Sequence, residues 1–375
     1  MRILTYCYEY PPFGGGAGSA LAELARQWTD QGHEVSVVTG SRARSVEGTG
    51  RSRIIRLATG RRRRESSTFI ERIAYMAEAR RTCERIYEQV RPEVLVNFFA
   101  LPGSGDACLY LKKRYGLPFV TQLRGSDVPG PGSEGLSWIY AAAGPFLRRI
   151  CRESSAVIAV GQDLAGRAVR AYGIRGPVVI PNGVDTERYK PAERAEEGVV
   201  NVLYCGRLLE SQKRLSTLLR ALASARGVRL DVVGDGPDRR SYEALVRRLD
   251  VSGIVRFHGW IDKSELPSWY ARAHIFVNAS PAEGMPNAVL EAMASSCALL
   301  LSDIPTHHEI ASEPDNALFF APSDPEALAS KLRALAANPG LRRRMGEYNR
   351  RRVLEQHHWP VLASRHLDVL RSVVA

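Results

Sequence analysis

The stretch that decides the fold is "VNVLYCGRLLESQKRLSTLLRALASARGVRLDVVGDG", residues 200–236. It opens on a short run of β-branched and apolar residues, which is typical of a strand. The middle segment, "LSTLLRALASARG", repeats apolar residues at helical spacing, and the end, "LDVVGDG", is strand-like again. A strand, a helix and a second strand in this order predict two parallel strands joined by a crossover helix.

The same alternation continues through almost the whole chain. Strand-like runs lie at residues 2–8, 34–39, 94–99, 118–123, 156–160 and 178–182, and then at 200–206, 230–236, 255–260, 274–280, 298–303 and 317–322. Amphipathic segments stand between them, and "HHWPVLASRHLDVLRSVV" near the C-terminus is one more amphipathic helix. The pattern predicts an α/β protein with doubly wound parallel sheets.

Length and one break in the pattern predict two domains. A chain of 375 residues exceeds one typical core. The segment "TERYKPAERAEEGV" (186–199) is polar and contains proline, so we interpret it as an interdomain linker. The first Rossmann-like domain is then expected over 1–186 and the second over 187–357. Ligands of such sheets bind at the carboxyl ends of the strands, so the functional residues are expected in the loops that follow strands.

Composition narrows the classes of function. The chain is 45% hydrophobic and 25% charged, as expected for a globular protein, and no apolar run reaches the length of a membrane span. The six cysteines form no CxxC pair, so neither a zinc site nor a disulfide framework is indicated, and a cytoplasmic location is expected. Residues 1–190 carry a net +10 of the total +12, which favours an anionic partner. No zinc finger, basic zipper or aromatic RNA-binding signature accompanies that charge, so nucleic acid is not the expected partner.

Two loops in the first half could carry chemistry. Gly14 to Gly18 precede a helix and could bring its backbone amides close to a phosphate, although a flexible turn is the alternative. A dinucleotide fingerprint fails, because Ser19 takes the sixth position and no acidic residue ends the second strand; an NAD oxidoreductase is therefore disfavoured. Arg124 and Asp127 follow another strand, where a surface loop capped by Asp127 is the alternative.

Three further loops lie in the second half. Arg207 and Lys213 flank the passage from a strand into a helix, and two cations there suit a diphosphate. A glycine-rich turn, "VVGDGPD", gives a weaker indication of an anion site. In "ASPAEGMPNAVLEAMA" (279–294), Asn287 is expected to cap a helix, and Glu283 and Glu291 could accept hydrogen bonds from sugar hydroxyls and a ribose diol.

The order and spacing of these motifs resemble the family 4 glycosyltransferases of the GT-B fold over nearly the whole chain. The matching pieces are "YPPFGGG", "RGSDVP", "IPNGVDTERY", "GRLLESQK", "VGDGP", "EGMPNAVLEAMA" and "SDIPTHHEI". The resemblance implies two Rossmann-like domains facing across a cleft, with the acceptor bound by the first and a nucleotide-sugar by the second. It also implies that the final helix, about 358–375, crosses back to the first domain.

The resemblance also implies roles for individual residues. The residues expected to take part in catalysis are Arg207, Lys213, Glu283, Arg124 and Asp127. The residues expected to bind the donor are Gly15, Gly16, Gly234, Gly236, Trp260, Ile261, Glu283, Gly284, Met285, Pro286, Asn287, Ala288, Val289 and Glu291. Trp260 and Ile261 would lie near the base, and the amides of 285–289 would hold the β-phosphate and the sugar. Neither a metal nor another cofactor is expected.

Three departures from the family's pattern stand out. Arg124 occupies a position where the family commonly has histidine, the spacing from Arg207 to Lys213 is one residue longer, and "SSCALLL" replaces a glycine-proline step. The resemblance further implies transfer with retention of anomeric configuration, through same-face attack in which the leaving diphosphate takes the acceptor's proton. Guanidinium and ammonium groups and helix-start amides would stabilise the charge on that diphosphate.

The expected activity is transfer of a hexosyl unit from a nucleotide-sugar, with UDP favoured over GDP, to a hydroxyl of a glycan, a glycolipid or a small molecule. The alternatives are a GT-B-type sugar-nucleotide 2-epimerase and a catalytically inactive GT-B interaction protein. The basic stretch "RSRIIRLATGRRRR" (51–64) and the helix-like segment after it also suggest peripheral contact with an anionic membrane, with a solvated basic loop as the alternative.

Overall fold

The computed structural model describes residues 1–48, 50–61, 67–100, 103–125, 127–130, 137–194 and 198–374. It divides into two compact units, the first formed by Met1–Asn182 with Trp359–Ala375 and the second by Gly183–His358. The sequence placed this boundary after residue 186. No helix within the described ranges is both long enough and apolar enough to cross a membrane.

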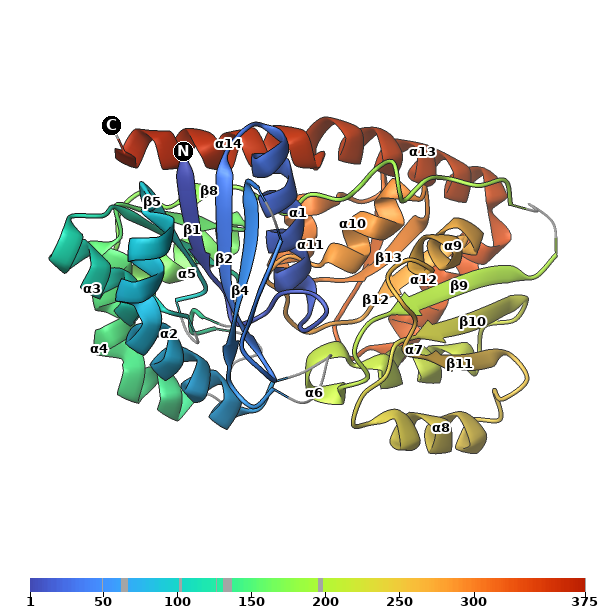
Figure 1. Cartoon of the computed structure of the whole chain (residues 1–375). Coiled ribbons are helices and arrows are strands. Elements are labelled where there is room, and N and C mark those ends of the chain that lie inside the picture. Colours follow the sequence, from blue (N-terminus) through green and yellow to red (C-terminus); the bar gives the residue numbers. More distant parts are fainter. Residues whose placement is uncertain are drawn as a thin grey trace. The chain divides into compact units, whose positions relative to one another are not determined.

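The first unit is built on an eight-stranded sheet in the order β3-β4-β2-β1-β5-β6-β7-β8, in which only the short edge strand β3 runs antiparallel to its neighbour (Figure 1). Its strands are β1 (Arg2–Tyr6), β2 (Glu34–Ser41), β3 (Ser45–Glu47), β4 (Ser52–Ala58), β5 (Val94–Phe98), β6 (Phe119–Leu123), β7 (Ala156–Ala159) and β8 (Val178–Val179). Its helices are α1 (Gly16–Asp30), α2 (Phe69–Val90), α3 (Gly105–Tyr115), α4 (Ser137–Glu153), α5 (Gln162–Tyr172) and α14 (Trp359–Val374).

The C-terminal helix α14 belongs to the first unit, as the resemblance implied. It packs on α1, where the indole N–H of Trp28 donates a hydrogen bond to the carbonyl of Ala363 at 3.3 Å. Trp28, Leu362 and Leu367 are all buried in the core of this unit. The amphipathic pattern of the last residues therefore serves to cover the core of the first unit.

The second unit contains a six-stranded parallel sheet in the order β11-β10-β9-β12-β13-β14. Its strands are β9 (Val200–Cys205), β10 (Val228–Val233), β11 (Val255–Gly259), β12 (Ile275–Asn278), β13 (Ala298–Ser302) and β14 (Ala317–Phe320). Its helices are α6 (Glu210–Lys213), α7 (Leu215–Leu222), α8 (Arg239–Arg248), α9 (Leu266–Arg272), α10 (Asn287–Ala294), α11 (Pro305–Ile310), α12 (Pro325–Ala337) and α13 (Pro339–Gln356). The strand order reverses between β9 and β12, so ligands are expected at the carboxyl ends of these two strands.

Two of the described strands of the first unit, the short β3 and its neighbour β4, were missed in the sequence. Residues 52–58 form β4, which pairs in parallel with β2, although this stretch was interpreted as part of a basic surface. Arg61, just beyond the strand, is buried, and its Nη1 donates to the carbonyl of Tyr8 at 2.7 Å. The interpretation of Arg61 as a membrane-facing cation is therefore wrong. Arg62, Arg63 and Arg64 lie outside the described residues.

Candidate functional site

An ion pair lies at the carboxyl ends of β9 and β12 in the second unit. Lys213 ends the short helix α6, and its Nζ lies 2.5 Å from Oε1 of Glu283 in the loop after β12. Both side chains are largely shielded, with 26% and 12% of their surfaces exposed. Burial alone would raise the pKa of Glu283, but the charge and hydrogen bond of Lys213 outweigh it and lower that pKa. Glu283 is therefore ionised at neutral pH.

The loop that carries Glu283 is tied down on both sides. Asn278, the last residue of β12, donates from Nδ2 to Oε1 of Glu283 at 3.4 Å. The hydroxyl of Thr306 donates to the main-chain carbonyl of Glu283 at 3.0 Å. Gly284 follows in the same loop and is partly buried. These contacts fix the carboxylate in one orientation before any ligand binds.

The second glutamate has a different environment. Glu291 lies one turn into α10, and the hydroxyl of Tyr270 donates to its Oε2 at 2.7 Å. Burial raises the pKa of Glu291, and the hydrogen bond from Tyr270 offsets part of that rise. The two glutamates of the motif thus differ physically, since Glu283 is held by a cation and Glu291 by a phenol.

The start of α10 requires two corrections. The helix begins at Asn287 itself, with Pro286 at the cap position and no side-chain cap, so Asn287 is not the predicted N-cap. The amides of all five residues 285–289 were expected to hold the β-phosphate and the sugar, but two of them cannot. Pro286 has no N–H, and the amide of Val289 donates to the carbonyl of Pro286 at 3.0 Å. Pro286 and Val289 therefore drop out of the set of amides expected to hold the β-phosphate and the sugar.

Other predicted donor residues share this edge of the sheet. Arg207 follows β9, and its carbonyl accepts a hydrogen bond from the hydroxyl of Tyr204 at 3.1 Å. Trp260 and Ile261 follow β11; Trp260 is more than half exposed, and Ile261 packs against the buried core. An exposed indole at the carboxyl end of a parallel strand offers a flat surface on which a base could stack.

Gly234 and Gly236 have a packing role in the turn after β10. A Cβ added to Gly234, where φ is +127°, would lie 1.9 Å from the carbonyl oxygen of Gly206. A Cβ on Gly236 would lie 2.3 Å from the carbonyl oxygen of Leu208. The two loops after β9 and β10 therefore pack backbone against backbone, which explains both glycines without a ligand.

In the first unit, Arg124 follows β6 and is half-buried. Its Nη2 donates to Oδ1 of Asn182 at 2.7 Å, and its guanidinium lies 4.8 Å from the ring centre of Phe98. Burial lowers the pKa of Arg124 to about 10, with the charge of Asp127 opposing that shift. The side chain stays cationic at neutral pH, so it cannot act as a general base.

Asp127 organises the loop that contains Arg124. Its carboxylate is fully buried and accepts backbone amides from Arg124 (2.9 Å), Gly125 (2.9 Å) and Ala100 (3.2 Å). The carboxylate of Asp127 thus binds the main-chain amide of Arg124, while the guanidinium of Arg124 binds Asn182. Because the carboxylate is occupied by amides and shielded from solvent, we infer a structural role for Asp127 in place of the predicted catalytic one.

The glycine loop of the first unit already has a carboxylate at its helix start. Gly15 is the cap residue of α1, Gly16 is its first residue, and the amide of Gly15 donates to Oε2 of Glu9 at 3.0 Å. A Cβ on Gly14 would lie 2.6 Å from Cβ of Glu9. A side chain at position 14 would therefore clash with Glu9, which is one reason for a glycine there that involves no ligand. The sequence analysis did not single out Glu9.

His307 is a second residue that the sequence analysis did not single out, although it lies in the motif "SDIPTHHEI". It is fully buried, and its Nδ1 donates to the carbonyl of Ser302 at 2.7 Å. Burial lowers the pKa of His307 to about 4, so the ring is neutral at physiological pH. Among the described residues, no group of three or more His, Cys, Asp and Glu side chains is arranged to hold a metal ion.

Comparison with known proteins covers both units. The profile of Glycosyltransferase Family 4 matches residues 14–188, and that of Glycosyl transferases group 1 matches residues 200–338. The lipopolysaccharide core biosynthesis glycosyltransferase LpsE of Rhizobium meliloti (strain 1021) is 29% identical over 198 residues, 52% of this chain. This chain covers 57% of that relative's length.

Solved structures share the fold over the full length. Sucrose-phosphate synthase from Thermosynechococcus elongatus superposes with a TM-score of 0.84 at 20% identity, covering 99% of this chain and 98% of its own. Anabaena Alr3699/HepE in complex with UDP gives a TM-score of 0.77 at 16% identity, covering 99% and 100%. Two parallel sheets, a C-terminal helix packed on the first unit and two family profiles that together span most of the sequence agree on one assignment. The chain belongs to the family 4 glycosyltransferases of the GT-B fold, enzymes that use a sugar-nucleotide donor.

Proposed function

We propose that this chain is a retaining hexosyltransferase that prefers a UDP-sugar to a GDP-sugar and transfers the sugar to a hydroxyl group. The observation that carries this proposal is the Lys213–Glu283 ion pair, held at the carboxyl ends of β9 and β12 beside the start of α10. A fixed cation, a fixed carboxylate and a helix start together suit the diphosphate and the sugar of one donor.

The leaving diphosphate is the group that needs stabilisation. As the anomeric bond breaks, negative charge develops on the β-phosphate, and Lys213 and Arg207 are the cations that we assign to it. A phosphate that binds Lys213 displaces Glu283 from its ion pair and leaves its oxygens to accept the donor's sugar hydroxyls. Because Glu283 is ionised, it does not protonate the leaving group, which fits a reaction in which the diphosphate takes the acceptor's proton.

The nucleoside end of the donor is assigned to Glu291 and Trp260. Tyr270 engages Oε2 of Glu291, and a carboxylate has enough acceptor sites left to bind a vicinal diol. A ribose at Glu291 places its base toward the loop after β11, where Trp260 is exposed. The preference for UDP is supported by a neighbour of the same fold whose structure contains UDP.

A thermal-shift screen of UDP, GDP, ADP and dTDP tests the donor assignment. A ligand that binds only the folded chain stabilises it by about 2.7 kcal/mol at 100 times its Kd, so the preferred nucleotide gives the largest rise in Tm. UDP is expected to give that rise. A larger response to GDP would overturn the base preference, and no response to any nucleotide would contradict the donor site.

Product analysis tests the reaction itself. Incubation with the preferred UDP-sugar and an acceptor should yield a glycoside with the donor's anomeric configuration, as read by proton NMR. An epimerised sugar nucleotide, formed without any acceptor, would identify a 2-epimerase instead. Inversion at the anomeric carbon would contradict the retaining assignment.

The acceptor side has an exposed apolar surface. Phe69, Ile70 and Ile73 in the first turns of α2 are each at least half exposed, and Thr68 and Glu71 fix the helix start through a capping box. Exposed apolar side chains that follow a basic stretch in the sequence suit an anionic bilayer, where each Phe or Ile contributes about 1.5–3 kcal/mol when it is buried. A lipid-linked acceptor at the membrane surface is therefore part of the proposal.

A further inference from the structure

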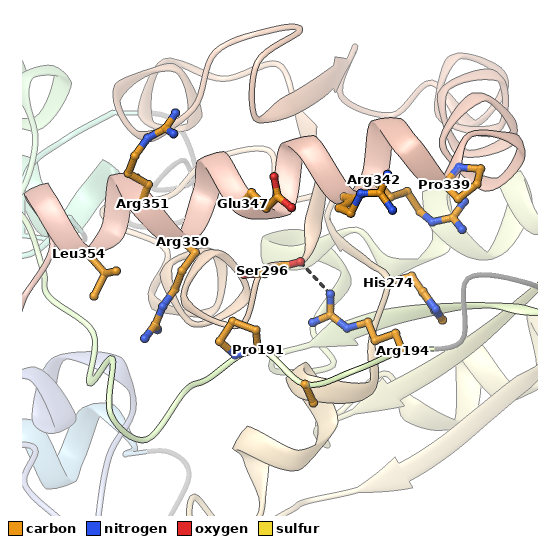
Figure 2. Close-up of a pocket in the computed structure, with 12 residues that line it drawn as sticks. Pro191, Arg194, His274, Ser296, Pro339, Arg342, Glu347, Arg350, Arg351 and Leu354 are labelled. Carbon is orange, nitrogen blue, oxygen red and sulfur yellow. Dashed lines mark hydrogen bonds between the residues drawn. The ribbon is translucent and has the colours of Figure 1, made fainter.

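A cavity of about 570 Å³ lies in the second unit, at the opposite edge of the sheet from the donor residues (Figure 2). His274 lines it and immediately precedes β12, whereas Asn278 ends that strand and Glu283 follows it. The four residues of β12 separate its two ends by roughly 13 Å. The cavity is therefore distinct from the proposed donor site.

The wall of this cavity is strongly basic. Five of its side chains are arginines and one is a carboxylate: Arg194, Arg342, Arg343, Arg350, Arg351 and Glu347. Pro191, Pro339 and Leu354 add an apolar part. The size lies within the usual range for small-molecule sites, and the excess of positive charge selects an anion.

Two of these arginines are held in place by neutral groups. Figure 2 shows Arg194 hydrogen-bonded to Ser296 and Arg350 extending from α13. Their hydrogen bonds go to the main-chain carbonyls of Tyr270, Ala271, Ser295 and Ser296 for Arg194, and of Thr186, Tyr189 and Ala294 for Arg350. Carbonyl oxygens orient a guanidinium and leave its formal charge in place, so the cavity is preorganised for an anion.

We propose that this cavity binds a small phosphorylated metabolite, of the size of a sugar phosphate, as an effector. The exposed lining arginines, Arg343 and Arg351, carry the planar fork that matches a phosphate, Arg194 and Arg350 add fixed positive charge, and the apolar part of the wall accommodates the carbon body of the ligand. The five arginines and one glutamate of the lining carry a net charge of +4. A phosphate monoester dianion neutralises half of that charge.

The effector site is linked to the donor site through α10. Arg194 and Arg350 bind carbonyls at the C-terminal end of this helix, Ala294 to Ser296, while its first turns carry the proposed donor contacts. A helix of eight residues is about 12 Å long and is bonded along its length, so we expect a shift of one end to be passed to the other. A ligand that draws the two arginines toward the cavity therefore changes the position of the donor-binding end. This step rests on the proposed function.

Isothermal titration calorimetry on the whole chain tests the site without any measurement of activity. Glucose 6-phosphate should bind with a Kd below about 1 mM, whereas neutral glucose should not bind. Inorganic phosphate should compete with glucose 6-phosphate. Absence of binding by glucose 6-phosphate, or equal binding of glucose, would overturn the proposal.

Charge variants on α13 locate the binding. The double change Arg343→Glu with Arg351→Glu alters two exposed lining positions and should weaken glucose 6-phosphate binding at least ten-fold, whereas Glu347→Gln removes the one carboxylate and should tighten it. Arg344→Glu is the matched control, an exposed arginine on the same helix outside the lining, and should leave the Kd within two-fold. Equal weakening in the control would mean that only the general charge of the surface matters and would overturn the site.

The coupling has a separate readout. The Kd of UDP, measured with and without saturating glucose 6-phosphate, should change, and the Kd of glucose 6-phosphate should change by the same factor when UDP is present. If glucose 6-phosphate binds while the affinity for UDP stays constant, the link through α10 is wrong. If UDP does not bind at all, the proposed function fails, and the direct binding of glucose 6-phosphate still decides the cavity.

Discussion

Replacing Lys213 by alanine should separate its role in catalysis from its role in stability. The ammonium lies 2.5 Å from Glu283 and is the cation that we assign to the leaving diphosphate. Loss of one preorganised charge stabiliser costs about 3–4 kcal/mol in the transition state, so turnover should fall by roughly 100-fold or more. Arg207→Ala should have an effect of similar size.

Stability should change less and should depend on pH. Breaking a fully buried ion pair costs about 3–5 kcal/mol, but a quarter of Lys213 is exposed, so we expect about 1–2 kcal/mol at neutral pH. In the wild type the pKa of Glu283 is lowered, so its stabilisation is present above its ordinary pKa and is lost as the pH falls through the lowered value. Without Lys213 only burial remains and the pKa rises, so the stability deficit of the variant should shrink as the pH falls from about 7 toward about 4.

Urea unfolding and initial rates with a UDP-sugar measure both effects. Lys331→Ala is the matched control, since Lys331 also lies 2.5 Å from a carboxylate of the second unit, Glu313, but at a more exposed position. It should cost no more than about 1 kcal/mol and should leave turnover unchanged. Near-wild-type turnover in both Lys213→Ala and Arg207→Ala would refute the donor-site assignment.

Four other expectations can be checked directly. Activity should persist in excess EDTA, because the sequence has no Asp-x-Asp motif; complete loss that Mg²⁺ or Mn²⁺ restores would contradict this. Arg124→Ala and Arg124→Lys should lose most of the turnover, while Arg124→His stays partly active; full rates in all three, with unchanged donor affinity, would make Arg124 structural only. Asp127→Ala should lower the unfolding free energy by about 3 kcal/mol in urea titrations, because three backbone amides lose a buried acceptor; a change within error would contradict its role in the loop. Phe69→Ser with Ile70→Ser should reduce sedimentation with anionic vesicles at low salt, and binding equal to wild type would refute the membrane-facing assignment of α2.

The sheets were predictable because their strands are buried on both faces. In β5, β6 and β13 every residue is buried, so each strand reads as a mostly apolar run in the sequence. β4 was missed for the opposite reason. It lies next to the edge strand β3, only Arg56 and Leu57 of its seven residues are buried, and three arginines interrupt the apolar pattern of "RSRIIRLA". Strands near an edge carry a weaker periodic signal than strands at the centre of a sheet.

The candidate site was predictable only at the level of loops. Parallel topology brings the ends of β9 and β12 together, so Lys213 and Glu283 could be assigned to one edge from the motif order alone. Which atoms meet depends on side-chain packing, and for that reason the phenol of Tyr270 on Glu291 and the carboxylate of Glu9 at the start of α1 had no sequence signal. The glycines of the turn after β10 match a phosphate loop in sequence but serve backbone packing in the structure.

Net charge does not by itself locate the surfaces of this chain that can attract an anion, for a physical reason. Arg61, Arg194 and Arg350 were all counted in the total of +12, yet each donates hydrogen bonds to main-chain carbonyls. A guanidinium carries five N–H donors, so it can bind the carbonyls at a helix end or in a loop and remain charged. An arginine used in this way adds to the formal charge, but its field reaches a ligand only where a cavity opens beside it. Arg61 is closed off in the first unit, whereas Arg194 and Arg350 line a cavity in the second. The sequence analysis assigned nearly all of the anion attraction to residues 1–190, whereas Arg194 and Arg350, which line the cavity, both lie beyond residue 190.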